Sequence, residues 1–490
     1  MTIEHVLIAG QWRAADASET FRAENPATKE QLPDEYPVST WADCETALEG
    51  AATAFAEMRA LPGERLAGFL ETLVAILEQR KDEIVALAHQ ETAYPVSPRL
   101  ADGEFPRTTN QLLQAGAAAR EGSWRMPTID RENNIRSYFA AVGPVAVFGP
   151  NNFPLAFGSA SGGDFAAAIA AGNPVIAKAN TSHPGTTKLF AAAAHDAAEQ
   201  AGMPTGCVQL LYRTSHADGE RLVADPRLGA TGYTGSRTAG LKLKAAADAA
   251  GKPIYLELSS VNPVVILSGA LRTRSDEITD EFCGSCLMGT GQFCTNPGLV
   301  VLMKSEASEA FITAVAEKFK SSPVGTLLSG SVQQSLAKSL DALQSAGAKC
   351  VAGGTTDGGT GYSHANTLLV AEGSQLLANP EAMQTEAFGN TSLFVLADDV
   401  AQAGAIIDAL EGNLTGCIYS DTAGGDDDAY DQLAPRLREK VGRLLNDKMP
   451  TGVAVSPAMN HGGPYPATGH PGFTAVGIPA ALRRFAALQC

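Results

Sequence analysis

Cysteine is scarce in this sequence, with eight residues in 490, far below the density of a disulfide-stapled secreted domain. Basic residues are also few, because 36 Lys and Arg stand against 53 Asp and Glu, for a formal net charge of −17. A chain with this balance and no local basic run lacks the positive surface that nucleic-acid binding needs. We therefore expect reduced thiols and no nucleic-acid partner.

Long apolar runs and targeting signals are missing too. The N-terminal run Val6 to Gly10 is too short for a signal peptide, and no basic segment precedes it. The longest uncharged stretch, 137–163, is broken by three prolines and an Asn pair, so it cannot form a spanning helix. The sequence predicts a cytoplasmic protein with no membrane partner.

Motifs of several common chemistries are absent. The sequence has no G-x-G-x-x-G fingerprint, Walker P-loop, H-E-x-x-H or G-x-S-x-G elbow. Its one Cys-x-x-Cys, formed by Cys283 and Cys286, lacks a second pair and a His at ligand spacing. We expect these two thiols to be buried packing groups, and no metal site.

Hydrophobic residues make up 45% of the chain, which is enough to form a large core over several domains. Apolar strand-like runs alternate with helical segments between residues 144 and 258, which predicts a doubly wound parallel sheet. Strands are expected at 144–149, 174–179, 207–212, 230–234 and 253–259, with helices at 165–172, 184–201, 216–224 and 236–250.

The second half predicts another α/β domain, and residues 1–125 predict a hairpin-like piece followed by amphipathic helices, one of them over 67–90. The expected strands of the second half are 263–267, 299–303, 367–371, 392–396, 416–420 and 442–447, with helices at 275–290, 306–320, 331–346 and 400–411.

Three polar positions follow or end apolar strands. An Asn pair stands between prolines in 148–154, Glu257 interrupts an apolar strand, and Cys294 lies in a loop between glycines and prolines. Each has a plain alternative: turn chemistry for the Asn pair, a salt-bridged Glu, and an inert packing Cys. Taken together, an amide, a carboxylate and a thiol at strand ends offer an oxyanion donor, a base and a nucleophile.

Six motifs occur in a fixed order along the chain, and through them it resembles the aldehyde dehydrogenase superfamily over essentially its full length. They are PNNFP (150–154), KANTS (178–182), YTGSRTAG (233–240), LELSS (256–260), GQFC (291–294) and EAFGN (386–390).

The resemblance implies an α/β fold of the aldehyde dehydrogenase type. A doubly wound parallel-sheet cofactor domain would take residues 1–125 and 143–259, and an α/β catalytic domain residues 260–456. A β oligomerisation arm and C-terminal tail would take 126–142 and 457–490.

The resemblance also implies the catalytic roles. Cys294 would attack the aldehyde carbonyl, and the Asn152 amide with the Cys294 backbone N–H would stabilise the oxyanion. After hydride transfer to a nicotinamide, Glu257 would activate water to hydrolyse the thioester.

The implied cofactor is NADP, with NAD still accepted. Thr181 stands where many NAD-preferring members carry a Glu, and a hydroxyl there can donate to a 2′-phosphate, with Arg213 adding charge. The alternative is that Thr181 is only a turn residue and selectivity is loose. The implied cofactor residues are Lys178, Thr181, Arg213, Gly235, Ser236, Gly240, Glu386 and Phe388.

The segments ELSS, EAFGN, 107–124 and 461–469 resemble the branch of 2,5-dioxovalerate (α-ketoglutaric semialdehyde) dehydrogenases. An anionic semialdehyde needs a cation or amide donors in the substrate tunnel. The candidates are Arg107, Gln111 and His461, with Phe153 as a tunnel wall. Arg107 could instead lie on the surface, His461 could orient its loop through the backbone, and Phe153 could be core.

Three rival functions remain open. One is oxidation of fatty or other aliphatic aldehydes. A second is a CoA-acylating dehydrogenase, against which the hydrolytic base Glu257 argues. The third is a non-catalytic structural relative, against which the retained Cys294, Asn152, Glu257 and Glu386 argue. The resemblance also implies a homodimer or homotetramer, with 131–142 as a projecting hairpin that the tail 482–490 pairs with.

Overall fold

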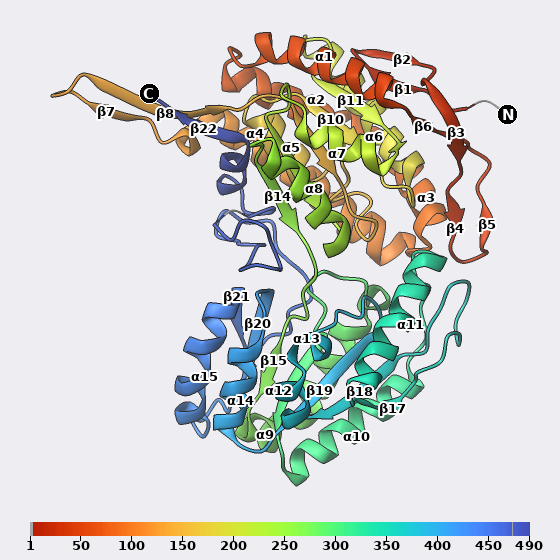
Figure 1. Cartoon of the computed structure of the whole chain (residues 1–490), viewed down its shortest axis with the longest axis vertical. Helices are drawn as coiled ribbons and strands as arrows, with labels where there is room; N and C mark the ends of the chain where they lie inside the picture. Colours follow the sequence, from red (N-terminus) through yellow and green to blue (C-terminus); the bar gives the residue numbers. More distant parts are fainter. Residues whose placement is uncertain (1–2, 473) are drawn as a thin grey trace.

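The computed structural model describes residues 3–472 and 474–490 and contains two seven-stranded sheets covered by helices (Figure 1). The first sheet has the order β14-β13-β9-β10-β11-β1-β2. Its strands are β14 (Ile254–Glu257), β13 (Ala230–Thr234), β9 (Val145–Phe148), β10 (Val175–Lys178), β11 (Val208–Leu211), β1 (Val6–Ile8) and β2 (Gln11–Arg13).

The five central strands are parallel, and β1 and β2 add an antiparallel edge, so the expected N-terminal hairpin is confirmed. The crossover helices fall within two residues of the expected bounds. They are α5 (Gly163–Ala170), α6 (Pro184–Gln200), α7 (His216–Ala224) and α8 (Arg237–Ala249). Val, Ile and Ala fill the buried strands, as a parallel sheet covered on both faces requires.

The second sheet has the order β17-β18-β19-β16-β15-β20-β21 and is parallel except for β17 at its edge. Its strands are β17 (Lys349–Ala352), β18 (Thr367–Glu372), β19 (Thr391–Ala397), β16 (Leu299–Met303), β15 (Val264–Ile266), β20 (Asn413–Tyr419) and β21 (Val441–Asn446). Its larger helices are α9 (Ser268–Leu287), α10 (Glu306–Ser321), α11 (Gly330–Ser345), α14 (Val400–Ala409) and α15 (Asp427–Lys440).

The sequence missed two of these elements and misjudged two helices. Strand β17 is largely exposed, and helix α15 carries Pro435 in its interior, so both patterns are weak. The helix expected over 67–90 is two helices, α2 (Gly63–Gln79) and α3 (Lys81–Thr92), which break at Arg80. Helix α9 begins at Ser268, seven residues before the expected start, and kinks at Arg274.

A long hairpin projects from the body near the C terminus (Figure 1). It consists of β7 (Thr128–Asp130) and β8 (Ile135–Ala141), and β22 (Ala486–Gln489) pairs antiparallel with β8. The tail therefore joins the hairpin, as expected. Ile129 and Leu488 are 59% and 61% exposed, which leaves apolar side chains on this sheet in contact with solvent.

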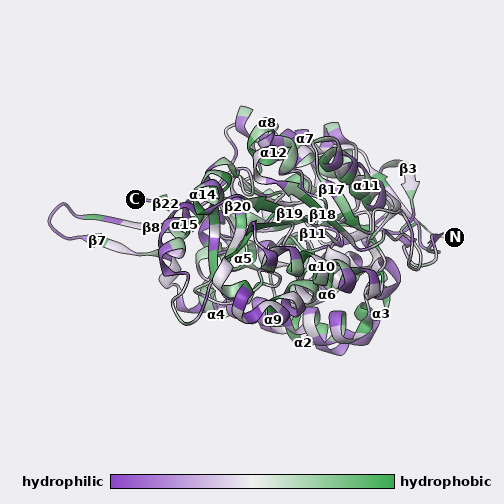
Figure 2. Cartoon of the chain, turned by 90° about the horizontal axis from the view of Figure 1, so that it is seen from below, coloured by the Kyte–Doolittle hydropathy of each residue, from purple (hydrophilic) through white to green (hydrophobic). Residues whose placement is uncertain are grey.

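Apolar residues are concentrated in the strands at the middle of the molecule, and polar residues lie mainly on the outer helices (Figure 2). None of the helices in the described residues combines the length and apolarity needed to cross a membrane. Strand β14 points its carboxyl end toward the second sheet, and the chain crosses there into β15 (Figure 1). Ligands of open α/β sheets bind beyond the carboxyl ends of the strands, so this junction is where a site is expected.

Candidate active site

The Asn loop that follows β9 is held by a buried ion pair. Glu104, in the π-helical segment Val96–Glu104, accepts hydrogen bonds from the backbone N–H groups of Leu155 (2.8 Å) and Ala156 (3.0 Å). Arg99 lies 3.3 Å from Glu104 and donates to the Asn152 carbonyl. Two opposite charges on one short segment thus fix the backbone on both sides of Phe153.

Asn152 is buried at the junction between the sheets. Its side-chain nitrogen donates to the carbonyl of Gln292, two residues before Cys294, at 3.0 Å. An amide nitrogen carries two hydrogens, so one remains to donate to a charge that develops beside Cys294. The structure thus brings the predicted oxyanion donor to the predicted nucleophile.

The loop of Cys294 leaves α9 through three successive positive-φ residues, Gly289, Thr290 and Gly291. A Cβ on Gly291 would lie 2.0 Å from the carbonyl oxygen of Gly389, so only glycine fits. Asn262 donates to the carbonyls of Cys294 (2.9 Å) and Asn296 (2.8 Å). Cys294 is therefore held by a side-chain amide rather than by regular secondary structure.

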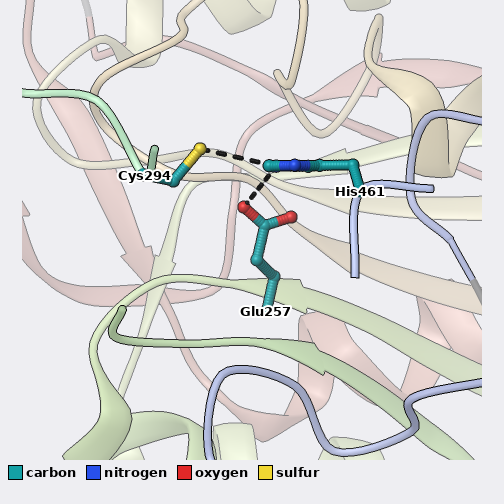
Figure 3. A group of neighbouring side chains, drawn as sticks. All are labelled: Glu257, Cys294 and His461. Atoms are coloured by element: carbon teal, nitrogen blue, oxygen red, sulfur yellow. Dashed lines mark hydrogen bonds and ion pairs between the residues drawn. The ribbon is translucent and has the colours of Figure 1, made fainter. Parts of the chain in front are cut away.

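Glu257 ends β14 and is 5% exposed. Its Oε1 lies 2.9 Å from His461 Nε2, and its Oε2 is buried with no protein partner. His461 Nε2 also lies 3.4 Å from Cys294 Sγ. The imidazole therefore stands between the thiol and the carboxylate, in reach of both (Figure 3).

Burial raises the pKa of the Cys294 thiol well above its ordinary value, the negative charge of Glu257 raises it further, and the Arg107 cation opposes the rise. The resting thiol is therefore protonated. Nucleophilic attack requires the thiolate, so the thiol must lose its proton before it reacts.

His461 lies beside both the thiol and the carboxylate, which the sequence did not predict. We expected a substrate contact or a loop anchor, and its backbone N–H does donate to Thr474 Oγ1 at 2.9 Å. Nothing in the sequence indicates that His461 lies beside Cys294 and Glu257, because 204 residues separate it from Glu257.

The candidate substrate residues have different surroundings. Arg107 lies on α4 (Phe105–Glu121), and its Nη1 donates a hydrogen bond to the Val453 carbonyl. Its Nε and Nη2 are buried and have no hydrogen-bond partner in the protein. It is thus not the surface residue that we considered as an alternative. Gln111 is almost fully buried and donates to the Ala156 carbonyl at 2.7 Å, so its amide nitrogen braces the Asn loop.

Aromatic rings surround the Asn loop. Phe153 meets Phe293 edge-on at 5.2 Å between ring centres and Phe157 at 5.3 Å. The Arg99 guanidinium lies 4.2 Å from the Phe153 ring centre, a cation–π distance. Phe153 therefore belongs to a small apolar cluster with Ala156 and Phe293 that borders the reactive residues.

A pocket of about 670 Å³ opens beyond the carboxyl ends of β9, β10 and β13. Five of the expected cofactor residues line it: Lys178, Thr181, Arg213, Gly235 and Ser236. Burial, and then the nearby Arg213 cation, lowers the pKa of Lys178 to about 8. Two cations and the start of α8 give this pocket the donors that a phosphate-bearing dinucleotide needs.

The other three expected cofactor residues lie elsewhere. Glu386 and Phe388 line a smaller cavity with Phe293, and burial raises the pKa of Glu386 to about 7. A Cβ on Gly240 would lie 2.5 Å from Leu258, so this glycine lets α8 pack closely on the sheet.

Cys283 and Cys286 are buried on α9, as expected. Sequence reasoning missed four residues that hold the site: Arg99, Glu104, Asn262 and Asn413, whose Oδ1 accepts hydrogen bonds from the N–H groups of Val261 and Asn262. Of the four, only Asn413 could have been singled out from the sequence, because it is a polar residue at the start of a buried strand.

The family model described as "Aldehyde dehydrogenase family" matches residues 12–463. Alpha-ketoglutaric semialdehyde dehydrogenase 2 of Azospirillum brasilense is 36% identical, with 100% of this chain and 94% of the relative covered. Alpha-ketoglutaric semialdehyde dehydrogenase of Acinetobacter baylyi is 34% identical, with 99% and 92% covered.

Solved structures share the fold at lower identity. PnpE in complex with nicotinamide adenine dinucleotide has a TM-score of 0.85 at 20% identity, covering 100% of this chain and 97% of that one. A 1-pyrroline-5-carboxylate dehydrogenase from Thermus with bound NAD has a TM-score of 0.84 at 22% identity, covering 99% and 92%.

Glu257→Gln should speed alkylation of Cys294 by iodoacetamide at pH 7 to 8. Removing the negative charge lowers the thiol pKa, and each unit of lowering gives roughly tenfold more thiolate below that pKa. Peptide mass spectrometry would follow the rate, with the exposed Cys350 as internal control. An unchanged or slower rate at Cys294 would show that Glu257 does not hold the thiol protonated.

Proposed function

This chain belongs to the aldehyde dehydrogenase family, and from that premise we propose that it oxidises 2,5-dioxovalerate (α-ketoglutaric semialdehyde) to 2-oxoglutarate with NADP as preferred acceptor. The observation that carries the proposal is the meeting of Cys294, His461 and Glu257 beside the Asn152 amide. The names of the two relatives above support the choice of substrate.

The first step is formation of the thiolate. The thiol proton leaves to solvent, and the Nε2–H of His461, which donates to Glu257 Oε1 at 2.9 Å, can turn to the sulfur at 3.4 Å and stabilise the thiolate. The thiolate then attacks the aldehyde carbon. The free N–H of the Asn152 amide and the Cys294 backbone N–H donate to the oxyanion, and such donors give large catalytic terms.

The second step is hydrolysis of the acyl-cysteine. A bound nicotinamide supplies the hydride acceptor that makes this thioester possible. Glu257 then takes a proton from the water that attacks the acyl carbon. Its Oε2 has no protein partner, which supports a role in holding that water.

Lys178, Arg213 and Thr181 support the preference for NADP. They line one pocket, and a 2′-phosphate there would meet an ammonium, a guanidinium and a hydroxyl. Glu386 and Phe388 border the cavity next to Phe293, on the nicotinamide side of the proposed cofactor.

Arg107 supports an anionic substrate. Two of its guanidinium nitrogens are buried without a partner, and its charge acts on Cys294. An unpaired buried donor is costly unless a ligand satisfies it, and a guanidinium binds a carboxylate in a bidentate fork. Fatty aldehydes are the second candidate, favoured by the aromatic cluster of Phe153, Phe157 and Phe293.

We also propose a homodimer or homotetramer in which the exposed apolar residues of β7, β8 and β22 are covered by another copy. We further propose a cofactor domain of residues 1–125 and 143–259 and a catalytic domain of residues 260–456. The segments 126–142 and 457–490 form the arm and tail.

Glu257→Gln should give a burst of about one NADPH per chain and then almost no turnover, because acylation proceeds and hydrolysis stops. Loss of a general base costs roughly 10²- to 10⁴-fold in the steady-state rate. Stopped-flow absorbance would separate the two phases. Cys294→Ala should lose both phases and keep NADP binding, whereas Cys286→Ser, a buried thiol on α9, should keep both. Wild-type turnover by Glu257→Gln would remove it as the base.

The affinity for NADP should fall as pH rises above about 8, where free Lys178 loses its proton. Below that pH the ammonium is already charged and needs no proton uptake to bind phosphate. Above it, Kd should rise by up to about tenfold per pH unit until the pKa of the bound state is reached. Lys178→Met should bind weakly with a flat profile, and Lys252→Met, outside the pocket, should keep the slope. A steep slope in Lys178→Met would assign the titration elsewhere.

Arg107→Gln should lower kcat/KM for 2,5-dioxovalerate by about 10- to 100-fold, since a charged hydrogen bond contributes roughly 1.5–3 kcal/mol. Hexanal, which has no carboxylate, should be oxidised at a nearly unchanged rate. Arg120→Gln on the same helix, where Arg120 pairs with Glu64 and Glu71 at the surface, is the matched control. Equal losses for both aldehydes would refute carboxylate binding by Arg107. Preference of the wild type for hexanal would favour the second candidate.

A further inference from the structure

Three side chains of different ligand chemistry converge in the reactive centre (Figure 3). A carboxylate oxygen of Glu257, the thiol sulfur of Cys294 and an imidazole nitrogen of His461 all lie within 4.8 Å of one another. They come from the end of β14, the loop after α9 and the segment after β21. Among the described residues, no other group of His, Cys, Asp and Glu side chains meets in this way.

We propose that this cluster is also a capture site for Zn²⁺ and other thiophilic divalent ions, and that such binding reversibly blocks the enzyme. The inhibitory consequence rests on the proposed function. The binding itself rests on donor chemistry alone, since thiolate, imidazole and carboxylate are the three ligand types that Zn²⁺ uses in proteins.

The distances suit a tetrahedral ion. Zinc bonds of about 2.3 Å to sulfur and about 2.0–2.2 Å to nitrogen and oxygen place neighbouring donors about 3.3–3.6 Å apart. Sγ and Nε2 are already 3.4 Å apart. Nε2 and Oε1, at 2.9 Å, must separate slightly, and the carboxylate can turn because its second oxygen has no protein partner to lose.

Binding replaces a proton by a metal ion. The S–H bond of Cys294 breaks, an S–Zn bond forms, and that proton leaves to solvent. The imidazole proton moves through solvent from Nε2 to Nδ1, so that the Nε2 lone pair binds the ion, and no electron is transferred. A thiolate and a carboxylate together neutralise the dication. Both the nucleophile and the base are then occupied, and neither reaches the aldehyde or the hydrolytic water.

The neighbouring charges predict selectivity. The Arg107 and Arg443 cations act on Cys294 and oppose any dication. Only an ion that gains strongly from the thiolate bond overcomes this repulsion. Mg²⁺ and Ca²⁺ prefer sets of oxygen ligands and gain nothing from sulfur, so they should not bind.

The test counts bound metal and needs no turnover. The parent protein carries Cys350→Ser and Cys490→Ser, which removes the two exposed thiols. After treatment with chelator it is dialysed against ZnCl₂ with a weak competing chelator, and zinc is counted by mass spectrometry. We expect one zinc per chain, inhibition at the same zinc concentrations, and full recovery with EDTA.

Variants locate the ion. Cys294→Ala and His461→Ala should each weaken zinc binding by at least about 100-fold, since even outer-shell partners contribute about 10- to 100-fold. His461→Gln serves if the alanine variant melts at a lower temperature. Cys286→Ser should bind as the parent does. With Co²⁺ instead of zinc, the parent should show a near-ultraviolet thiolate-to-cobalt absorption that Cys294→Ala lacks.

Two outcomes would overturn the proposal. One is parent-like affinity in both His461 variants, which would mean that the thiol binds alone. The other is a zinc count that Cys294→Ala leaves unchanged. A chain that binds zinc as described but oxidises no aldehyde would refute the proposed function and leave the metal site standing.

Discussion

The reactive centre depends on side-chain amides that satisfy backbone groups where the chain crosses from one sheet to the other. Between β14 and β15 the backbone belongs to no sheet, and its buried N–H groups still need partners. Asn413 Oδ1 accepts from the N–H groups of Val261 (2.9 Å) and Asn262 (3.2 Å). Asn262 in turn donates to the carbonyl of Cys294. One short network thus sets the crossover after Glu257 and the loop of the nucleophile together.

The elements around this centre were largely predictable, and its contacts were not. Parallel strands such as β13 and β16 show as apolar runs with defined ends, so the expected strands match to within a few residues. The motifs at those strand ends also predicted three of the site residues, Cys294, Glu257 and Asn152. By contrast, the place of His461 is set by the fold of the C-terminal segment, and Glu104 reaches the Asn loop from a π-helical segment. Neither local spacing nor composition reports such long-range pairings.

A shifted pKa does not by itself mark function in this molecule. Burial raises the pKa of both Glu91 and Glu386 to about 7. Glu91 accepts hydrogen bonds from the N–H groups of Gly185 and Thr186 at the start of α6, which is a structural cap. Glu386 lines a cavity beside Phe293. The surroundings, more than the direction of the shift, separate the two roles.

The protonated state of Cys294 also bears on how the protein withstands oxidants. Peroxide attacks thiolates and leaves protonated thiols almost untouched. A resting enzyme whose Cys294 thiol stays protonated therefore exposes little of the vulnerable form between turnovers. Burial and the charge of Glu257, which keep this thiol protonated, thus guard the sulfur against irreversible conversion to sulfinic acid.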